Sequence, residues 1–197
     1  IKANDFVSPD GLKGIDNNLY RAWGCDAPWR GNGNATLDLR ANDKMTDAQK
    51  KVVADIVAGP RGHLVGPFIP LMRSPDFMDR LQKTGEYLRY NSAFEPRLSE
   101  LAILITARLW SQNFEWYAHR PIAEKAGLKV AIIDAIADGR RPAEMTADEA
   151  VIYDFLDELI RTKTVAETTY QRAIKAFGER GIIDLVGIHG YYSLLAM

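Results

Sequence analysis

The stretch PRLSELAILITARLW, residues 96–110, decides the fold. It is apolar on almost every side when drawn as a helix, and a helix of that kind belongs at the buried centre of a helical domain. No segment of the chain alternates apolar and polar residues for long enough to indicate a β-sheet. The sequence therefore predicts an all-α fold built around this helix.

Helix start and stop signals divide the chain around that segment. Three residue pairs have capping-box spacing, in which a hydroxyl and a longer side chain three residues later satisfy each other's backbone amides: Thr46 with Gln49, Thr146 with Glu149, and Thr164 with Glu167. Three glycines stand where a left-handed residue would end a helix: Gly59, Gly127 and Gly139. Together the signals predict helices near residues 46–57, 75–91, 96–110, 113–126, 129–137, 146–161, 165–177 and 181–196.

The first 44 residues differ from the rest of the chain. They mix Gly, Asn, Asp and Pro with two tryptophans and show no helical period, so we predict an irregular N-terminal arm over 1–44 and one helical domain over 45–197. Because Trp23 and Trp29 would be costly to leave in water, we expect the arm to pack either on its own domain or on a neighbouring subunit.

Composition excludes several classes of partner and site. The 25 basic and 26 acidic residues are scattered, so no basic stripe predicts a nucleic-acid or membrane partner. A single cysteine, Cys25, excludes an internal disulfide framework and any two-cysteine redox or zinc site within one chain, and favours a reducing, cytoplasmic location. The longest apolar run, LAILITA, is too short to span a bilayer.

Glu100 is an exception within the apolar segment. Its helical neighbours are Ile103, Leu104 and Ala107, which places the carboxylate on an apolar face. A carboxylate there must find a partner or stay protonated. One interpretation is a structural salt bridge, for example to Arg97 or Arg108; the other is a functional site.

The next helix carries NFEWYAH, residues 113–119, in which Glu115 and His119 lie four residues apart on one face. A lone histidine on an apolar face is more often a core residue than a catalyst. Here, however, a very short turn at Ser111 and Gln112 should make the two helices antiparallel neighbours and bring Glu100 to the Glu115 and His119 pair. Two acids and one imidazole in a dry pocket are the parts of a proton-transfer site.

These residues occur within a longer set of motifs that resembles a known family. GPRGHLVGPFIPLMRSPDF, RLSELAILITARLWSQNFEWYAH, AEKAGL and GIHGYYSLLAM, spread over residues 59–197, resemble the carboxymuconolactone decarboxylase family of the AhpD-like superfamily. The resemblance implies a compact all-helical protomer, assembly into a trimer or hexamer, and cofactor-free decarboxylation of a small carboxylated lactone in aromatic catabolism. Its activity class would be a carbon-carbon lyase.

By motif position, the family's active-site glutamate falls on Glu100, and its Glu-Trp-x-x-His signature falls on Glu115, Trp116 and His119. The AhpD-type peroxidases of the superfamily carry a Cys-x-x-Cys pair whose positions here are Gln112 and Glu115. Without a thiolate there is no nucleophile for a hydroperoxide, and no disulfide can cycle. Peroxidase chemistry is therefore not expected.

The resulting hypothesis makes His119 the proton donor, with Glu115 or Glu100 orienting its ring. Trp110, Trp116 and Tyr117 are the candidate pocket walls. Arg97 and Arg73 are candidate anchors for a substrate carboxylate, although an arginine at a helix start is more often a solvated surface group. For the two remaining histidines, His63 and His189, a structural role is favoured.

Two other functions fit parts of the sequence. Two carboxylates and an imidazole can also bind a divalent metal, as in a metal-dependent lactone hydrolase or isomerase, but a second histidine at helical spacing is missing. Alternatively, a helical oligomer could bind a small molecule without catalysing a reaction. We expect no cofactor.

Overall fold

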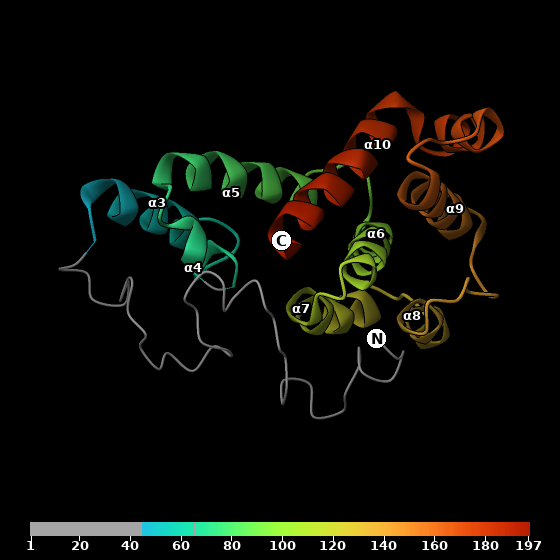
Figure 1. Cartoon of the computed structure of the whole chain (residues 1–197), viewed down its shortest axis with the longest axis horizontal. Helices are drawn as coiled ribbons and strands as arrows, with labels where there is room; N and C mark the ends of the chain where they lie inside the picture. The colour runs from blue at the N-terminus through green and yellow to red at the C-terminus, as the bar shows by residue number, and fades with distance from the viewer. Residues whose placement is uncertain (1–44, 65) are drawn as a thin grey trace. The chain divides into compact units, whose positions relative to one another are not determined.

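The computed structural model describes residues 45–64 and 66–197, and the part of the chain it describes is helical without strands (Figure 1). The all-α prediction is confirmed for these residues. The predicted arm, residues 1–44, lies outside them. The described helices are α3 (Asp47–Ala58), α4 (Phe68–Leu71), α5 (Pro75–Tyr90), α6 (Pro96–Leu109), α7 (Asn113–Lys125), α8 (Val130–Ala137), α9 (Ala147–Thr162) and α10 (Glu167–Ala196).

The described residues form two compact units, 45–86 and 87–197, where the sequence predicted one helical domain over 45–197. Each unit is described by itself. The predicted helices match the observed ones to within two residues at nearly every end, and the short helix α4 was not predicted. None of the helices within residues 45–64 and 66–197 combines the length and the apolar character needed to cross a bilayer.

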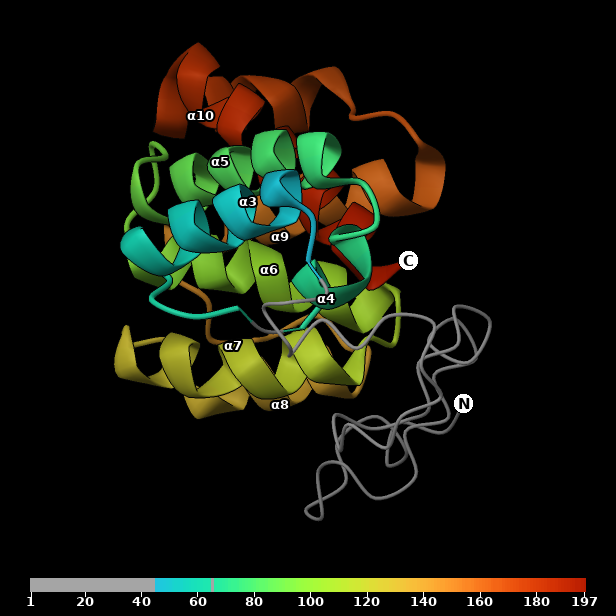
Figure 2. The same cartoon turned by 90° about the vertical axis from the view of Figure 1, so that its left-hand side faces the viewer.

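The 45–86 unit holds α3, α4 and most of α5, and Figure 2 shows α3 running alongside α5. Its core is built from buried side chains of all three helices and the segment between them: Val52, Ile56, Phe68, Met72 and Met78. The core is tied to the start of α3, because the buried Gln49 amide donates to the Met72 carbonyl oxygen at 2.9 Å.

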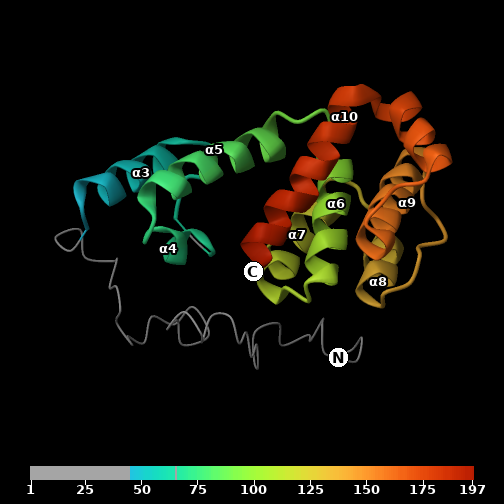
Figure 3. The ribbon, with the colours of Figure 1, turned by 45° about the horizontal axis from the view of Figure 1, so that its top comes forward.

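The 87–197 unit is organised around α6. This helix packs against α7, α8, α9 and α10, and every side chain from Leu98 to Ala107 is buried (Figures 1 and 3). The prediction of a central, buried helix is confirmed. Because α6 contacts four other helices, any group on it is held by the whole unit.

Helix α10 bends sharply at Gly178, which separates the two helices predicted over 165–177 and 181–196 (Figure 3). Gly178 has φ 67° and ψ 179°, a conformation that side chains other than glycine rarely adopt. The bend also brings the backbone of Gly181 against Phe177, where an added Cβ would lie 2.4 Å from the Phe177 Cβ. The two glycines therefore fix the direction of the C-terminal half of α10.

Two of the three predicted capping boxes are present, at Thr46 with Gln49 and at Thr146 with Glu149. The third prediction, Thr164 with Glu167, is wrong: α10 begins after Ala166, which has no side-chain cap of its own. The preceding helix supplies the cap instead, since Glu158 Oε2 accepts from the Ala166 amide at 2.8 Å.

The predicted stops at Gly127 and Gly139 are confirmed, with φ of 92° and 70°. Gly59 does end α3, but in an extended conformation with φ −80° rather than a left-handed one. Its amide still reaches back to the Asp55 carbonyl at 3.1 Å, so the last turn of α3 closes without a left-handed residue.

We predict that Glu158→Ala lowers the thermal unfolding midpoint by about a few degrees, because it removes the acceptor for the Ala166 amide and for the Thr169 hydroxyl. Thr164→Ala, in the same turn, is the matched control and should leave the midpoint unchanged. Circular dichroism melts of both variants test this. Equal losses in the two variants would show that Glu158 does not cap α10.

Candidate active site

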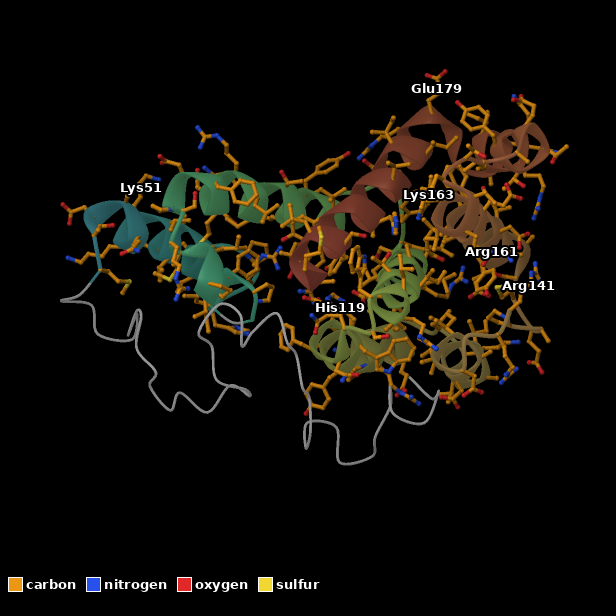
Figure 4. All side chains as sticks on the ribbon, viewed as in Figure 1. Lys51, His119, Arg141, Arg161, Lys163 and Glu179 are labelled. Carbon is orange, nitrogen blue, oxygen red and sulfur yellow. The ribbon has the colours of Figure 1, made fainter. Side chains whose placement is uncertain are left out.

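Glu100, Glu115 and His119 meet in the 87–197 unit, as the sequence predicted. Glu100 comes from α6, and the other two come from α7. His119 Nδ1 lies 2.6 Å from Glu100 Oε2, and His119 Nε2 lies 3.5 Å from Glu115 Oε2. Figure 4 shows the His119 side chain on α7, beside the C-terminal end of α10. The imidazole thus has one carboxylate at each nitrogen.

A short turn brings the two helices together. Trp110 ends α6, Ser111 takes the left-handed conformation with φ 49°, and the Gln112 side chain caps α7 by accepting from the Phe114 amide at 3.2 Å. Helices α6 and α7 then pack directly against each other. This turn sets the register that places His119 opposite Glu100.

All three side chains are out of water, with exposed fractions of 3% for Glu100 and Glu115 and 4% for His119. Buried charges are stable only when they are paired and hydrogen-bonded. Glu100 finds its partner in His119, so neither arginine considered for a salt bridge is needed. The Arg108 Nε group donates instead to the Ala137 carbonyl at 2.8 Å.

The environment of His119 favours its charged form. Burial alone would lower the pKa of the imidazole, but the charge and hydrogen bond of Glu100, followed by those of Glu115, outweigh burial and raise the pKa to about 9. At neutral pH the ring is therefore an imidazolium between two acids, and both nitrogens carry a proton.

The two nitrogens of His119 are held unequally. The 2.6 Å contact at Nδ1 is a short, charge-assisted hydrogen bond to Glu100. The 3.5 Å separation at Nε2 is longer than the usual range for an N–H···O bond, so the interaction with Glu115 is chiefly electrostatic. Glu100 therefore orients the ring, and the Nε2 proton is the one that can be transferred.

Tyr192, on α10, completes the surroundings of the imidazole, and the sequence analysis missed it. Its ring lies edge-on to the His119 ring at 90°, with 5.0 Å between centroids. Burial, together with the charges of Glu115 and Glu100, raises the pKa of the Tyr192 hydroxyl well above its usual value, so the phenol stays neutral. No local spacing could have revealed a contact between residues so far apart in the chain.

The predicted pocket walls are not equivalent. Trp116 is buried, with 3% of its surface exposed, next to the catalytic candidates on α7. Trp110 and Tyr117 are 42% and 57% exposed, so most of their surface faces solvent. We call Glu100, Glu115 and His119 the triad. Of the three aromatic candidates, only Trp116 is buried as the triad is.

Arg97 is occupied by protein carboxylates. Its guanidinium pairs with Glu149, with Asp148 at 2.8 Å and with Glu95 at 2.7 Å. Although partial burial opposes it, hydrogen bonding to these acids raises the pKa of the arginine further. The geometry makes Arg97 a link between α6 and α9, and it does not support the predicted role as a substrate anchor.

Arg73 and His63 belong to the 45–86 unit, where both are exposed. The anchoring role of Arg73 stays a prediction. His189, on α10, is half-buried, and its Nδ1 lies 3.0 Å from the hydroxyl of Thr106 on α6. Burial lowers the pKa of His189, with a smaller contribution from Lys163, so the ring is neutral. This contact agrees with the structural role favoured for His189.

Within the described part of the chain, no group of three or more His, Cys, Asp or Glu side chains is arranged to hold a metal ion. In the triad, both imidazole nitrogens face carboxylates in hydrogen-bonding or ion-pairing geometry. Both nitrogens of His119 are thus taken up by interactions with protein carboxylates.

Comparison of the chain with models of protein families, with curated proteins and with solved structures found no match.

We predict that stability depends on pH through His119. Its folded-state pKa of about 9 exceeds the unperturbed 6.5, so its contribution is complete below pH 6.5 and is lost as the pH rises through 9. The difference corresponds to about 3 kcal/mol of unfolding free energy. Urea unfolding between pH 6 and 9.5 measures this loss.

Glu100→Gln removes the main counter-charge and should lower the pKa of His119, so that the loss of stability above pH 6.5 shrinks. Glu124→Gln, which breaks an exposed ion pair with Arg120 on the same helix, is the control and should keep the parent's pH profile. A parent chain equally stable at pH 6.5 and 9.5 would contradict the prediction.

Proposed function

We propose that this protein is a cofactor-free decarboxylase acting on a small carboxylated lactone, a carbon-carbon lyase of the carboxymuconolactone decarboxylase type. The observation that carries the proposal is the buried His119 imidazolium, oriented by Glu100 at Nδ1 and facing Glu115 at Nε2. The motifs that resemble the family supply the reaction class and the substrate class.

Decarboxylation needs a route for the electron pair of the broken bond and a proton for the carbon left behind. In a carboxylated lactone, the electrons of the C–COO⁻ bond move toward the lactone carbonyl and form an enolate as carbon dioxide leaves. His119 Nε2–H then gives its proton to a carbon atom of this enolate, and the ring becomes neutral. One proton from water restores the imidazolium, so each turnover consumes one proton.

The two glutamates have different roles in this reaction. Glu100 keeps Nδ1 protonated and the ring aligned, as an orienting carboxylate does in other imidazole relays. Glu115 stands beside the transferable proton at Nε2 without a tight hydrogen bond, which leaves that proton free to move to a substrate. Because the site is buried away from water, the negative charge of Glu115 repels the substrate carboxylate but not the neutral carbon dioxide product. This difference favours the loss of carbon dioxide.

The same relay would serve lactone isomerisation or hydrolysis, since both also move protons around a stabilised oxyanion. We propose decarboxylation among these three reactions because of the family resemblance. Peroxidase activity is not proposed, because Gln112 and Glu115 occupy the positions where the peroxidase branch has its cysteine pair.

We predict that the metal-stripped protein releases carbon dioxide from γ-carboxymuconolactone and that His119→Gln lowers kcat by at least about 100-fold, because the proton donor is lost. His189→Gln removes a neutral histidine outside the triad and should keep parent activity. Carbon dioxide release and the ultraviolet change of the lactone measure the reaction in parallel. Ultraviolet change without carbon dioxide would favour isomerisation or hydrolysis.

We also predict that kcat is constant at neutral pH and falls as the pH rises through about 9, because the donor must be protonated and its pKa is about 9. In Glu100→Gln this fall should move to lower pH, since the counter-charge is gone. A pH profile that does not change in Glu100→Gln would show that His119 is not the donor. No turnover by folded parent protein would remove the decarboxylase assignment altogether.

A further inference from the structure

Tyr192 contacts the imidazole from a third helix, and the reaction described above gives it no role. The ring is buried, with 4% of its surface exposed, and stands perpendicular to the ring of His119. It also meets Tyr191 edge-on at 81°, with 5.2 Å between centroids. Tyr192 is therefore held in one place while it borders the proton donor.

The side chain of Gln112 also joins the helix of Tyr192 to the helix of His119. The buried Gln112 accepts from the Phe114 amide at 3.2 Å, which starts α7, and its Nε2 donates to the Ala196 carbonyl at 3.0 Å, in the last turn of α10. Ala196 lies one turn beyond Tyr192. The bond from Gln112 thus holds the last helical turn of α10 against the start of α7.

The hydrogen bond of His119 does not restrict every motion of its ring. The short bond to Glu100 fixes Nδ1, but a ring held at one nitrogen can still tilt about that bond. The 3.5 Å separation from Glu115 is too long to stop the tilt. A perpendicular aromatic ring packed against the imidazole does restrict it, because a tilt would bring the two rings into collision.

We propose that Tyr192 is a positioning residue that holds the His119 ring with Nε2 toward Glu115, and that Gln112 keeps Tyr192 in place by joining α7 to the last turn of α10. The effect on rate rests on the proposed function, since misplaced donors transfer protons slowly. The positioning itself is a property of the free protein and can be measured without substrate.

The contact is made by the ring of Tyr192, and its hydroxyl is not needed for it. Among the described residues, the imidazole interacts with Glu100 from α6, Glu115 from α7 and Tyr192 from α10. Because the phenol stays neutral, Tyr192 adds no charge to this set. Tyr192→Phe should therefore preserve the position of His119, whereas Tyr192→Leu should release it.

The first measurement is the exchange of the His119 ring N–H protons with water, followed by NMR at pH 7 in the full chain labelled with ¹⁵N-histidine. The signals are assigned by their loss in His119→Gln. We expect slow exchange in the parent and in Tyr192→Phe, and at least tenfold faster exchange in Tyr192→Leu. Fast exchange in the parent would overturn the proposal, because a positioned, buried ring must protect these protons.

Gln112→Asn tests the link between the helices without removing the helix cap. Asparagine caps a helix as well as or better than glutamine, but it is one methylene shorter and no longer reaches the Ala196 carbonyl. We expect exchange in Gln112→Asn to rise in the same direction as in Tyr192→Leu. Exchange as slow as in the parent would show that Gln112 does not hold Tyr192.

Phe177→Leu is the control for general destabilisation. It removes another edge-to-face pair of α10, with Phe94 at 5.1 Å, in the half of the helix before the Gly178 bend. We expect slow exchange in this variant. Equally fast exchange in Phe177→Leu and Tyr192→Leu would overturn the proposal, since any loss of packing would then loosen His119.

Kinetics separate this inference from the proposed function. If the parent is a decarboxylase, Tyr192→Leu should lower kcat by about 10- to 100-fold with little change in KM, and Tyr192→Phe should restore kcat to within about threefold of the parent. A loss of kcat in Tyr192→Phe as large as in Tyr192→Leu would assign the effect to the hydroxyl and overturn the proposal. If the parent has no decarboxylase activity, the exchange measurements still decide whether Tyr192 positions His119.

Discussion

The ion pair between Glu100 and His119 is the interaction on which the rest of the 87–197 unit depends. Placing a carboxylate and an imidazolium in an apolar interior has a large desolvation cost, which the 2.6 Å hydrogen bond between them and the second carboxylate near Nε2 offset. Such a pair also specifies how α6 and α7 pack, since a different alignment would leave a buried charge without its partner. The same requirement that fixes the packing also keeps the His119 imidazole charged at neutral pH.

Different contacts hold the two members of this pair in place. The surface of α6 not occupied by α7 is covered by α8, α9 and α10, and Arg97 ties the start of α6 to the acids of α9. The rigid part of the site is therefore the helix that carries Glu100. His119 lies on α7, a helix with fewer neighbours. The Tyr192 ring packs against the imidazole from α10, and Gln112 in the turn bonds to the last turn of α10, so these two residues provide the contacts beyond α6 that hold His119.

Much of this arrangement could be predicted from the sequence because it depends on helical period. Glu100, Glu115 and His119 were found from spacings of three and four residues and from the short turn that makes their helices neighbours. What failed depends on tertiary contacts: Thr164 has good capping spacing, but Glu158 of another helix takes the cap, and two of the three acids that pair with Arg97 lie about 50 residues later. Tyr192 and the bond from Gln112 to Ala196 carry no periodic signal. The family resemblance stays a proposal, since no compared protein matched.

The left-handed Ser111 in the turn between α6 and α7 has a consequence for how this protein can change in evolution. The turn has no spare residue: one residue ends α6, one reverses the chain, and one caps α7. Each residue added there would rotate α7 by about 100° about its axis and move His119 off the face that meets Glu100. The number of residues between Glu100 and His119 is therefore itself part of the site. Homologues that keep the chemistry should therefore keep the length of this turn.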